Sequence, residues 1–374
     1  MSRCAVLMLA AAACGGDPAA IDAASGDSIG QDGSVDAPII PTKLVAYVSG
    51  GADIAWYDVD PQAGGLTRIS TIAAFRTGAS FLAHRGTSLY AVAANRVGAY
   101  TVAPATGALT FVNDVDAGGT GPTHVSIDAT GGHVFVANYN NGTISVFPVQ
   151  GNGGLGAASQ TLSPGANAHM IAADATNRSV FVPCLGSNLV AQYRFEPTTG
   201  VLTPNTPPSV ATAAGAGPRH IAFAPDGRHA YVINELDSTM TAYSLDPATG
   251  RLTSLQTLSS RAVGATGTNT TAEVVVHPSG KFLYGSNRGD NNIVVFAINA
   301  STGMLTLAGH TSTQGMTPRN FALDPAGTFL YAANAGSNSV VPFRIDATAG
   351  TLTPTAAAIT VPTPQFVGLF ALPL

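Results

Sequence analysis

Residues 217–236, with the sequence GPRHIAFAPDGRHAYVINEL, contain the pattern that decides the fold. Pro218 opens a short apolar strand, the turn Pro225-Asp226-Gly227 follows, and a second apolar strand ends at Asn234. A Pro-x-Gly turn between two short apolar runs is typical of antiparallel strands joined by a tight connection. The stretch therefore predicts two neighbouring antiparallel strands with polar residues at their ends.

The same pattern recurs from about residue 43 to residue 370. Each copy continues with a polar turn, a third apolar strand and a Gly-x-Leu-Thr hairpin. The second strands end 43 to 53 residues apart, at Ser49, Asn95, Asn138, Cys184, Asn234, Asn287 and Asn334. A period of about 40 to 50 residues with four short strands per unit is typical of a β-propeller. The count of copies predicts seven blades.

The two ends of the repeat region predict a closed ring. The first copy, Leu44 to Ser49, lacks the leading strand that the other copies have, and a strand of that type stands alone at residues 364–370. Pairing these two segments would complete one blade and remove the exposed sheet edges of an open repeat. We therefore expect an all-β fold: residues 42–374 form a seven-bladed β-propeller of four-stranded antiparallel blades, closed by the N- and C-terminal strands.

Charge is scarce and unevenly distributed along the 374 residues. Charged residues make up 10% of the chain, and the net charge is -5. Residues 1–40 hold five of the acidic side chains and a single basic one, so the remaining chain is almost neutral. Because a nucleic-acid binder needs a basic surface, this distribution excludes that class. The few charges in the repeat region become informative by their location.

The N-terminus has the features of an export signal. Arg3 is followed by a short apolar run that ends at Cys14, and the run is too short to span a membrane. We expect residues 1–14 to be a signal peptide. The stretch Ala11-Ala12-Ala13-Cys14 resembles the lipobox of bacterial lipoproteins, in which the cysteine is lipidated. Because Ala11 replaces the usual Leu, ordinary A-x-A cleavage remains the alternative.

Residues 15–41 are acidic and rich in small side chains, which predicts a flexible tether. Together the two segments predict an exported protein in the periplasm, at the outer membrane or on the cell surface. The only expected membrane contact is an N-terminal lipid on Cys14.

Repetition separates structural residues from candidate functional ones. The Asn at the end of the second strand recurs in five copies, and we interpret it as an Asx turn that satisfies its own backbone. His229 and His277 adjoin Pro-x-Gly turns and are expected to be solvated. Cys184 is the single cysteine of the repeat region and is interpreted as a packing residue rather than a nucleophile.

Topology predicts where the remaining charges gather. The first strand of a blade begins, and its antiparallel second strand ends, at the same edge of the sheet. Segments of both kinds should therefore meet at one mouth of the central channel. The segments concerned carry His124, His169, Arg219-His220, Glu273 and Arg319-Asn320 on the entering side, and Asn138-Tyr139, Glu235, Arg288 and Asn334 on the leaving side.

These segments also carry a resemblance to a known family. Gly217-Pro218-Arg219-His220 with Asn234-Glu235-Leu236, and Ala272-Glu273 through Ser286-Asn287-Arg288-Gly289, resemble the 6-phosphogluconolactonase-type seven-bladed lactonases. The similarity extends over residues 43–370. It implies hydrolysis of a sugar lactone without a metal ion or cofactor. The family also includes fungal cycloisomerases that open or close a muconolactone ring.

The resemblance implies particular site residues. Four positions match the catalytic groups of the cycloisomerases: His169, Arg219, Glu235 and Arg288. Five neighbouring positions would bind substrate: His220, Asn234, Glu273, Arg319 and Asn320. The chain departs from the family at Asn167, where many members have His, at Cys184, which replaces an Asp, and at Arg96, which replaces a Glu.

The expected chemistry follows from these residue types. Glu235 would act as general base, the arginines would bind an anionic group and the oxyanion, and His169 would protonate the ring oxygen. A Glu235→Gln change should abolish turnover and leave thermal stability nearly unchanged. The alternative is that Arg219 and Glu235 merely tie two strands together.

A different class of function also remains open. Val134–Asn138 and Tyr331–Asn334 resemble non-catalytic surface propellers, which would make the protein a binding or scaffolding module of the cell envelope. The expected partner is a small-molecule lactone or sugar acid, and we expect a monomer.

Overall fold

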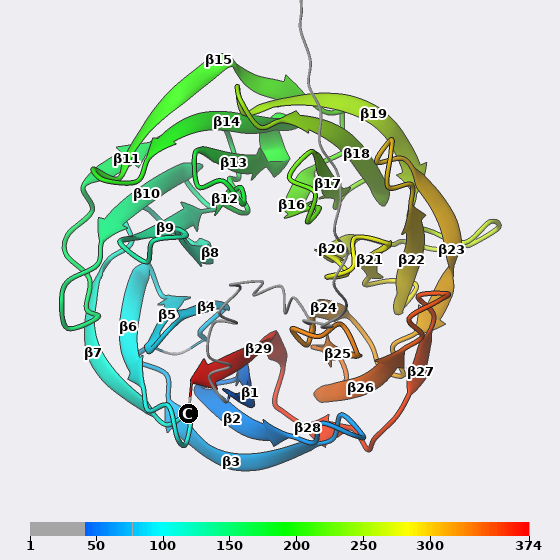
Figure 1. Cartoon of the computed structure of the whole chain (residues 1–374), viewed down its shortest axis with the longest axis horizontal. Coiled ribbons are helices and arrows are strands. Elements are labelled where there is room, and N and C mark those ends of the chain that lie inside the picture. Colours follow the sequence, from blue (N-terminus) through cyan, green and yellow to red (C-terminus); the bar gives the residue numbers. More distant parts are fainter. Residues whose placement is uncertain (1–41, 77, 374) are drawn as a thin grey trace, which may run out of the picture. The chain divides into compact units, whose positions relative to one another are not determined.

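The computed structural model describes residues 42–76 and 78–373 and consists of seven β-sheets arranged in a ring (Figure 1). The predicted seven-bladed propeller is therefore confirmed. The predicted signal peptide, Cys14 and the tether at residues 15–41 lie outside the described residues. Within the described ranges, the only helical segment is one 3-10 turn, η1 (Leu185–Ser187), and no helix is long and apolar enough to cross a membrane.

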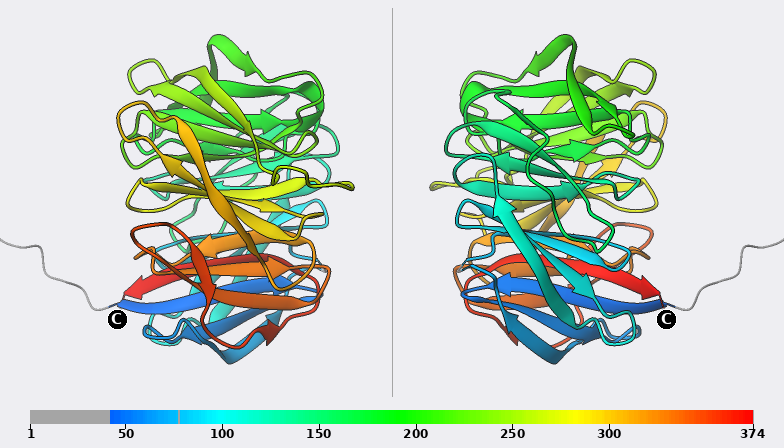
Figure 2. Two further views of the ribbon diagram at one scale, coloured as in Figure 1. Left: turned by 90° about the vertical axis from the view of Figure 1, so that its right-hand side faces the viewer. Right: turned by 90° about the vertical axis from the view of Figure 1, so that its left-hand side faces the viewer.

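The ring closes as the two ends of the repeat region predict. Its closing sheet consists of β29 (Pro364–Pro373), β1 (Thr42–Gly50), β2 (Asp53–Val59) and β3 (Leu66–Ala73), in that order. The innermost strand, β29, pairs antiparallel with β1 from Thr42↔Pro373 to Gly50↔Pro364. Figure 2 shows these strands, red and blue, side by side.

The other six sheets follow one another along the chain, each with its first strand innermost. The first of these sheets consists of β4 (Phe81–Arg85), β5 (Ser88–Ala93), β6 (Arg96–Val102) and β7 (Leu109–Asp116). The second consists of β8 (Pro122–Ile127), β9 (His133–Asn138), β10 (Thr143–Pro148) and β11 (Gln160–Leu162). The third consists of β12 (Ala172–Ala173), β13 (Ser179–Cys184), β14 (Leu189–Glu196) and β15 (Val201–Ala211). The fourth consists of β16 (Pro218–Phe223), β17 (His229–Asn234), β18 (Thr239–Asp246) and β19 (Arg251–Ser259). The fifth consists of β20 (Thr271–Val276), β21 (Phe282–Asn287), β22 (Asn292–Ile298) and β23 (Leu305–Ser312). The sixth consists of β24 (Pro318–Leu323), β25 (Phe329–Asn334), β26 (Ser339–Ile345) and an outer edge divided into β27 (Leu352–Pro354) and β28 (Ile359–Thr360).

Burial follows the position of a strand within its blade. The second strand β17 is buried along its whole length, because neighbouring blades cover both of its faces. The outer strand β19 is mostly exposed, with buried residues only at intervals. The core lies between blades: one apolar cluster joins Val92 of β5 to Val136 of β9, and another joins Ile233 of β17 to Leu283 of β21.

A recurring tyrosine connects each of several blades to the next. Tyr47, Tyr231 and Tyr284 lie on second strands and donate a hydrogen bond to the carbonyl of a hairpin glycine in the following blade, at 2.7, 3.0 and 2.9 Å. The accepting residues are Gly107, Gly303 and Gly350, which adopt φ of 73°, 69° and 71°. Glycine adopts this left-handed turn conformation without strain.

The structure corrects two expectations about recurrent polar residues. His229 and His277 are buried rather than solvated, and His277 Nε2 lies 2.8 Å from the Gly327 carbonyl oxygen of the next blade. The strand-ending Asn does not form a local Asx turn: Asn138 Nδ2 donates to Ala117 O at 3.0 Å, and Asn287 Nδ2 donates to Ser260 O at 2.9 Å. His277, Asn138 and Asn287 therefore hold segments that are distant in sequence, which a short local motif does not reveal.

Candidate active site

Two backbone positions, repeated from blade to blade, carry the polar side chains at one mouth of the channel. The first is the residue directly after the second strand. Its N–H donates to the carbonyl oxygen of the residue that precedes the first strand, as for Tyr139 to Gly121 at 2.9 Å and Glu235 to Gly217 at 2.7 Å. Arg288 is held in the same way by Thr270 O at 2.8 Å. These three side chains therefore start from equivalent places on three blades.

The second position is a β-bulge near the start of the first strand. In β8, β16 and β24 the leading proline pairs with the last Asn of the second strand, and the next residue is skipped in the ladder. The skipped residues are Thr123, Arg219 and Arg319. A bulge frees one side chain from the alternation of the strand and redirects it. Here it places two arginines at the mouth of the channel.

Glu235 lies between two guanidinium groups at this mouth. Its Oε2 is 3.0 Å from Arg219 Nε, and its Oε1 is 2.9 Å from Arg288 Nη2. The side chain of Arg219 is 4% exposed, whereas those of Glu235 and Arg288 are 18% and 14% exposed. The carboxylate therefore remains within reach of solvent, while the arginine behind it does not.

Both arginines are also fixed to the beginning of β20. Arg219 Nη1 donates to Ala272 O at 2.6 Å, and Arg288 Nη2 donates to Thr271 O at 2.8 Å. Burial, together with the charge of Arg319, lowers the pKa of Arg219 to about 9. Burial and the neighbouring Arg288 also lower the pKa of Arg319. The mouth thus holds three guanidiniums close enough to repel one another, a setting that favours an anionic ligand.

A cavity of about 300 Å³ opens at this mouth. Glu235, Arg288, Arg319 and His169 line it together with Ser80, Gly121, Pro122, Thr123, Tyr139 and Asn140. The ring of Tyr139 packs edge-on against His169, with centroids 5.5 Å apart. Burial, and next the charge of Arg219, hold the pKa of His169 well below its ordinary value. His169 therefore presents a neutral imidazole, which can donate one proton and accept another.

A layer of buried polar side chains lies deeper in the channel. His220 Nδ1 is 2.8 Å from Glu273 Oε1, and Asn320 Nδ2 donates to Glu273 Oε2 at 2.5 Å. Asn320 Oδ1 in turn accepts from Val367 N of the closing strand at 2.9 Å. The His220 ring packs against His169 and His124, at 5.1 and 5.6 Å between centroids. This layer packs against the residues of the mouth cavity through the contact between His220 and His169.

On the other side of the layer, the channel contains a second cavity of about 450 Å³. Its walls are mainly apolar and include Phe81, Phe366 and Phe370, while Glu273, Asn320 and His124 border it. The channel is thus lined by charged and polar groups at the mouth where the first strands begin, and by aromatic groups beyond the buried layer.

The structure separates the nine sequence-predicted site residues into groups. Glu235, His169, Arg288 and Arg319 line the mouth cavity, and Arg219 lies directly behind Glu235. His220, Glu273 and Asn320 form the buried layer and do not line that cavity.

Asn234 lies apart from both groups. It is 1% exposed, and its Nδ2 donates to Thr239 Oγ1 and Thr241 Oγ1 at 2.8 and 3.0 Å, as expected of a structural residue.

Tyr139, which topology places at the mouth, does line the cavity, together with residues that the sequence does not single out, among them Ser80 and Thr123. Thr123 occupies the same repeat position as Arg219, so aligning the blades residue by residue finds it. In the described part of the chain, no three His, Cys, Asp or Glu side chains are grouped as a metal site would need. Cys184 is fully buried, and burial raises the pKa of its thiol to about 12.

The fold and the mouth define a propeller with a cationic, carboxylate-containing site, and comparison with known proteins assigns its family. Residues 42–369 match the model of the family described as lactonase, 7-bladed beta-propeller, so the chain belongs to this family.

Curated relatives of the chain are named 6-phosphogluconolactonase. The Pectobacterium carotovorum protein is 38% identical over 203 residues, and the match spans 54% of this chain and 60% of that protein. The Bacillus subtilis protein is 32% identical over 302 residues, which span 76% of this chain and 86% of that protein.

Solved structures share this fold. The periplasmic gluconolactonase of Pseudomonas aeruginosa superposes with a TM-score of 0.82 at 28% identity, covering 89% of this chain and 99% of that one. A protein from Lactobacillus plantarum superposes with a TM-score of 0.80 at 28% identity, covering 88% and 100%.

Proposed function

We propose that this protein is an exported lactonase that hydrolyses a sugar-acid lactone at the mouth formed by Glu235, Arg288, Arg319 and His169. The observation that carries the proposal is a carboxylate between two guanidiniums at the edge of a cavity of about 300 Å³. Membership of the lactonase family and the names of the relatives support the same reaction.

In the proposed reaction, the arginines stabilise the negative charge that develops on the lactone carbonyl oxygen. Arg288 and Arg319 face the cavity and would hold the carbonyl oxygen as it becomes an oxyanion, or an anionic substituent of the substrate. Arg219 would act indirectly. It is buried and bonded to Ala272 O, so it positions the carboxylate of Glu235.

Proton transfer is assigned to Glu235 and His169. Water attacks the lactone carbonyl carbon, and Glu235 takes the proton that this water loses. Both oxygens of Glu235 face a guanidinium, so one ion pair must loosen during this step. The ring C–O bond then breaks, and neutral His169 gives a proton to the departing oxygen. The proton on Glu235 returns to His169 through solvent, which leaves the open-chain hydroxy acid as product.

The substrate proposed first is a lactone without a phosphate group. The expected export signal and the name of the Pseudomonas protein, periplasmic gluconolactonase, both favour it over a phosphorylated intermediate of the cytoplasm. We propose further that the protein acts as a monomer and needs no cofactor.

A pH-stat assay over sugar-acid lactones, with and without a phosphate group, tests the proposal. The expected result is hydrolysis of glucono-δ-lactone well above the spontaneous rate. A folded protein that accelerates no lactone of the panel would contradict the proposal and favour the non-catalytic envelope propeller.

A further inference from the structure

A second polar pocket adjoins the proposed active site. It has a volume of about 290 Å³ and is lined by Thr268, Asn269, Thr270, Arg288, Gly289 and Thr317. Arg288 lines this pocket as well as the mouth cavity, so the two hollows meet at its side chain. We call the second pocket the threonine pocket.

One wall of the threonine pocket is the longest connection between two blades, eleven residues against nine for the next longest, residues 163–171. Residues 260–270 connect β19 to β20, whereas residues 117–121, 212–217 and 313–317 suffice for the equivalent connections in three other blades. Figure 2 shows this yellow loop extending beyond the strands at one face of the ring. A repeat acts as its own control, and an insertion found in one blade is not required by the scaffold.

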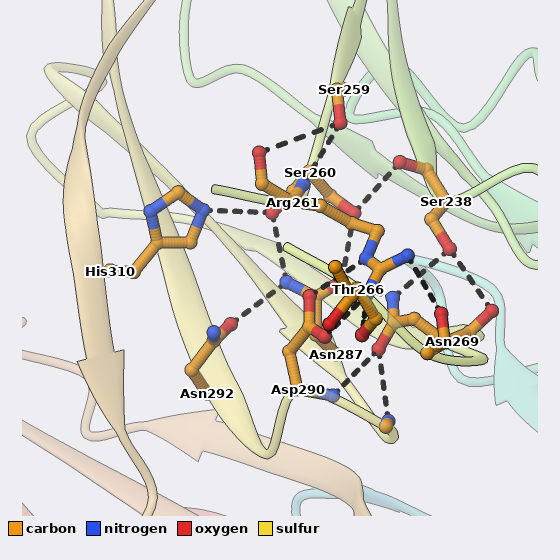
Figure 3. Close-up of polar contacts among 12 residues, drawn as sticks. Ser238, Ser259, Ser260, Arg261, Thr266, Asn269, Asn287, Asp290, Asn292 and His310 are labelled. Carbon is orange, nitrogen blue, oxygen red and sulfur yellow. Dashed lines mark hydrogen bonds and ion pairs between the residues drawn. The ribbon is translucent and has the colours of Figure 1, made fainter. Parts of the chain in front are cut away.

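The loop is fixed by a set of polar contacts (Figure 3). Arg261 Nε and Nη2 donate to the two carboxylate oxygens of Asp290 at 2.9 and 2.8 Å. The same guanidinium donates to the carbonyl oxygens of Thr266 and Gly267 at 2.9 and 3.1 Å. Arg261 thereby ties the loop to itself and to the turn after β21, so the wall of the pocket is formed before a ligand arrives.

Asn269 fixes the opposite side of the same wall. Its Oδ1 accepts from Gly289 N and Asp290 N at 2.9 and 3.0 Å, and its Nδ2 donates to Ser238 Oγ and Asn287 Oδ1. The backbone amides of Gly289 and Asp290 are thus already used and cannot bind an anion in the pocket.

Three threonine hydroxyls remain for a ligand. Thr268, Thr270 and Thr317 line the pocket, and their hydroxyls make no hydrogen bond to any described residue. Arg288 is the one cation among the residues that line the pocket; its Nη2 is held by Glu235 and Thr271, and its Nε is buried without a hydrogen-bond partner. Three hydroxyls beside a single guanidinium that already faces a carboxylate suit a neutral polyhydroxylated ligand better than a phosphate.

We propose that the threonine pocket is a subsite for a second sugar ring, and that the substrate class is a disaccharide aldonolactone. The lactone ring would lie in the mouth cavity at Glu235, and the attached glycosyl unit would pass Arg288 to reach the three threonines. This inference rests on the proposed lactonase function. Each hollow has the volume of a small ligand site, at the lower end of the usual range of about 300 to 1,000 Å³.

The test compares a disaccharide lactone with its monosaccharide counterpart. The kcat/KM of the full-length protein is measured in a pH-stat for cellobionolactone, maltobionolactone and glucono-δ-lactone, each corrected for spontaneous hydrolysis. At least one disaccharide lactone should be preferred over glucono-δ-lactone by tenfold or more. A Thr270→Val/Thr317→Val double variant should lower this preference by about tenfold.

A matched variant controls for the loss of a hydroxyl as such. Thr348 is exposed in the hairpin between β26 and β27, which antiparallel topology places at the opposite mouth, and Thr348→Val should leave the kinetics for every lactone unchanged. Equal thermal melting of both variants shows that folding is not the cause.

Two further outcomes are distinguishable. If glucono-δ-lactone is hydrolysed as well as the disaccharide lactones and the double variant changes no ratio, the subsite is overturned while the lactonase proposal stands. If no lactone is hydrolysed by the folded protein, the proposed function itself is overturned.

Discussion

Arg288 Nη2 lies 2.9 Å from Glu235 Oε1, although these two residues follow the second strands of different blades, β21 and β17. Glu235 also binds Arg219 of its own blade. One carboxylate therefore joins two sheets of the ring and faces the mouth cavity at the same time. Its catalytic and structural contributions must be separated by experiment.

Glu235→Gln should reduce lactonase kcat/KM by about 10² to 10⁴, the usual contribution of a general base. The structure revises the expected stability. Because the variant removes the charge that two guanidiniums face in a partly buried setting, we expect a loss of about 1–2 kcal/mol in the free energy of unfolding, between the values for exposed and buried pairs.

Glu196→Gln is the matched control for this change. Glu196 is exposed at the far end of β14, and its side chain bonds only to Thr198 among the described residues. Its loss should alter neither activity nor the urea unfolding midpoint beyond small effects. Full activity of Glu235→Gln would assign Glu235 a purely structural role.

Tyr231→Phe should destabilise the ring without affecting the site. The Tyr231 hydroxyl donates to Gly303 O across a blade boundary at 3.0 Å and is fully buried, so its removal should cost about 1–2 kcal/mol. Tyr243→Phe provides the comparison, because the buried Tyr243 hydroxyl has no hydrogen-bond partner among the described residues. We expect that change to be neutral or slightly stabilising. Equal effects of both variants on urea unfolding would contradict the assigned role of the tyrosine contact.

Lowering the pH should destabilise the protein at pH values above the range in which its carboxylates titrate. Burial is the main cause that lowers the pKa of His124, His169 and His220 below the ordinary value. Below about pH 6.5 the unfolded chain therefore binds protons that the folded protein does not, and unfolding becomes more favourable. Each histidine contributes up to about 1.4 kcal/mol per pH unit.

Urea unfolding at pH 7.5 and pH 5.5 measures this loss of stability. His124→Gln removes one of the three buried groups and should make the pH dependence shallower. Unchanged stability of the native protein between these two values would show that the histidines do not stay neutral in the fold.

Cys14→Ser tests the expected lipid anchor. In a bacterial host supplied with labelled palmitate, the unchanged protein should incorporate label and sediment with membranes. The serine variant should do neither. A native protein that is exported, unlabelled and soluble would instead identify ordinary cleavage after the A-x-A segment.

The sequence was sufficient to predict the ring, its seven blades and its closure, because each of these follows from a repeated pattern. The placement of individual site residues followed less completely. Arg219 and Arg319 reach the mouth through a β-bulge, and the only sign of that bulge in the sequence is the proline before each arginine. The residues before these prolines, Gly217 and Thr317, have a positive φ in the structure.

Glu273 and Asn320 show what the sequence leaves open. The resemblance implies that both bind substrate, and the structure places them in the buried layer, bonded to each other, at the border of the cavity of about 450 Å³. Which way such a side chain points depends on the bulge beside it and on the neighbouring blade. Neither of these is a local property of the sequence.

The pairing of β1 with β29 has a consequence for how the chain reaches its final form. The blade that is begun first during synthesis is the last to be completed, since its innermost strand is made of residues 364–373. Until those residues are available, the growing polypeptide has two unpaired edges and no route to a finished ring. Contacts between such distant parts of a chain form slowly. A nascent chain of this kind therefore keeps its ring open until residues 364–373 have been made.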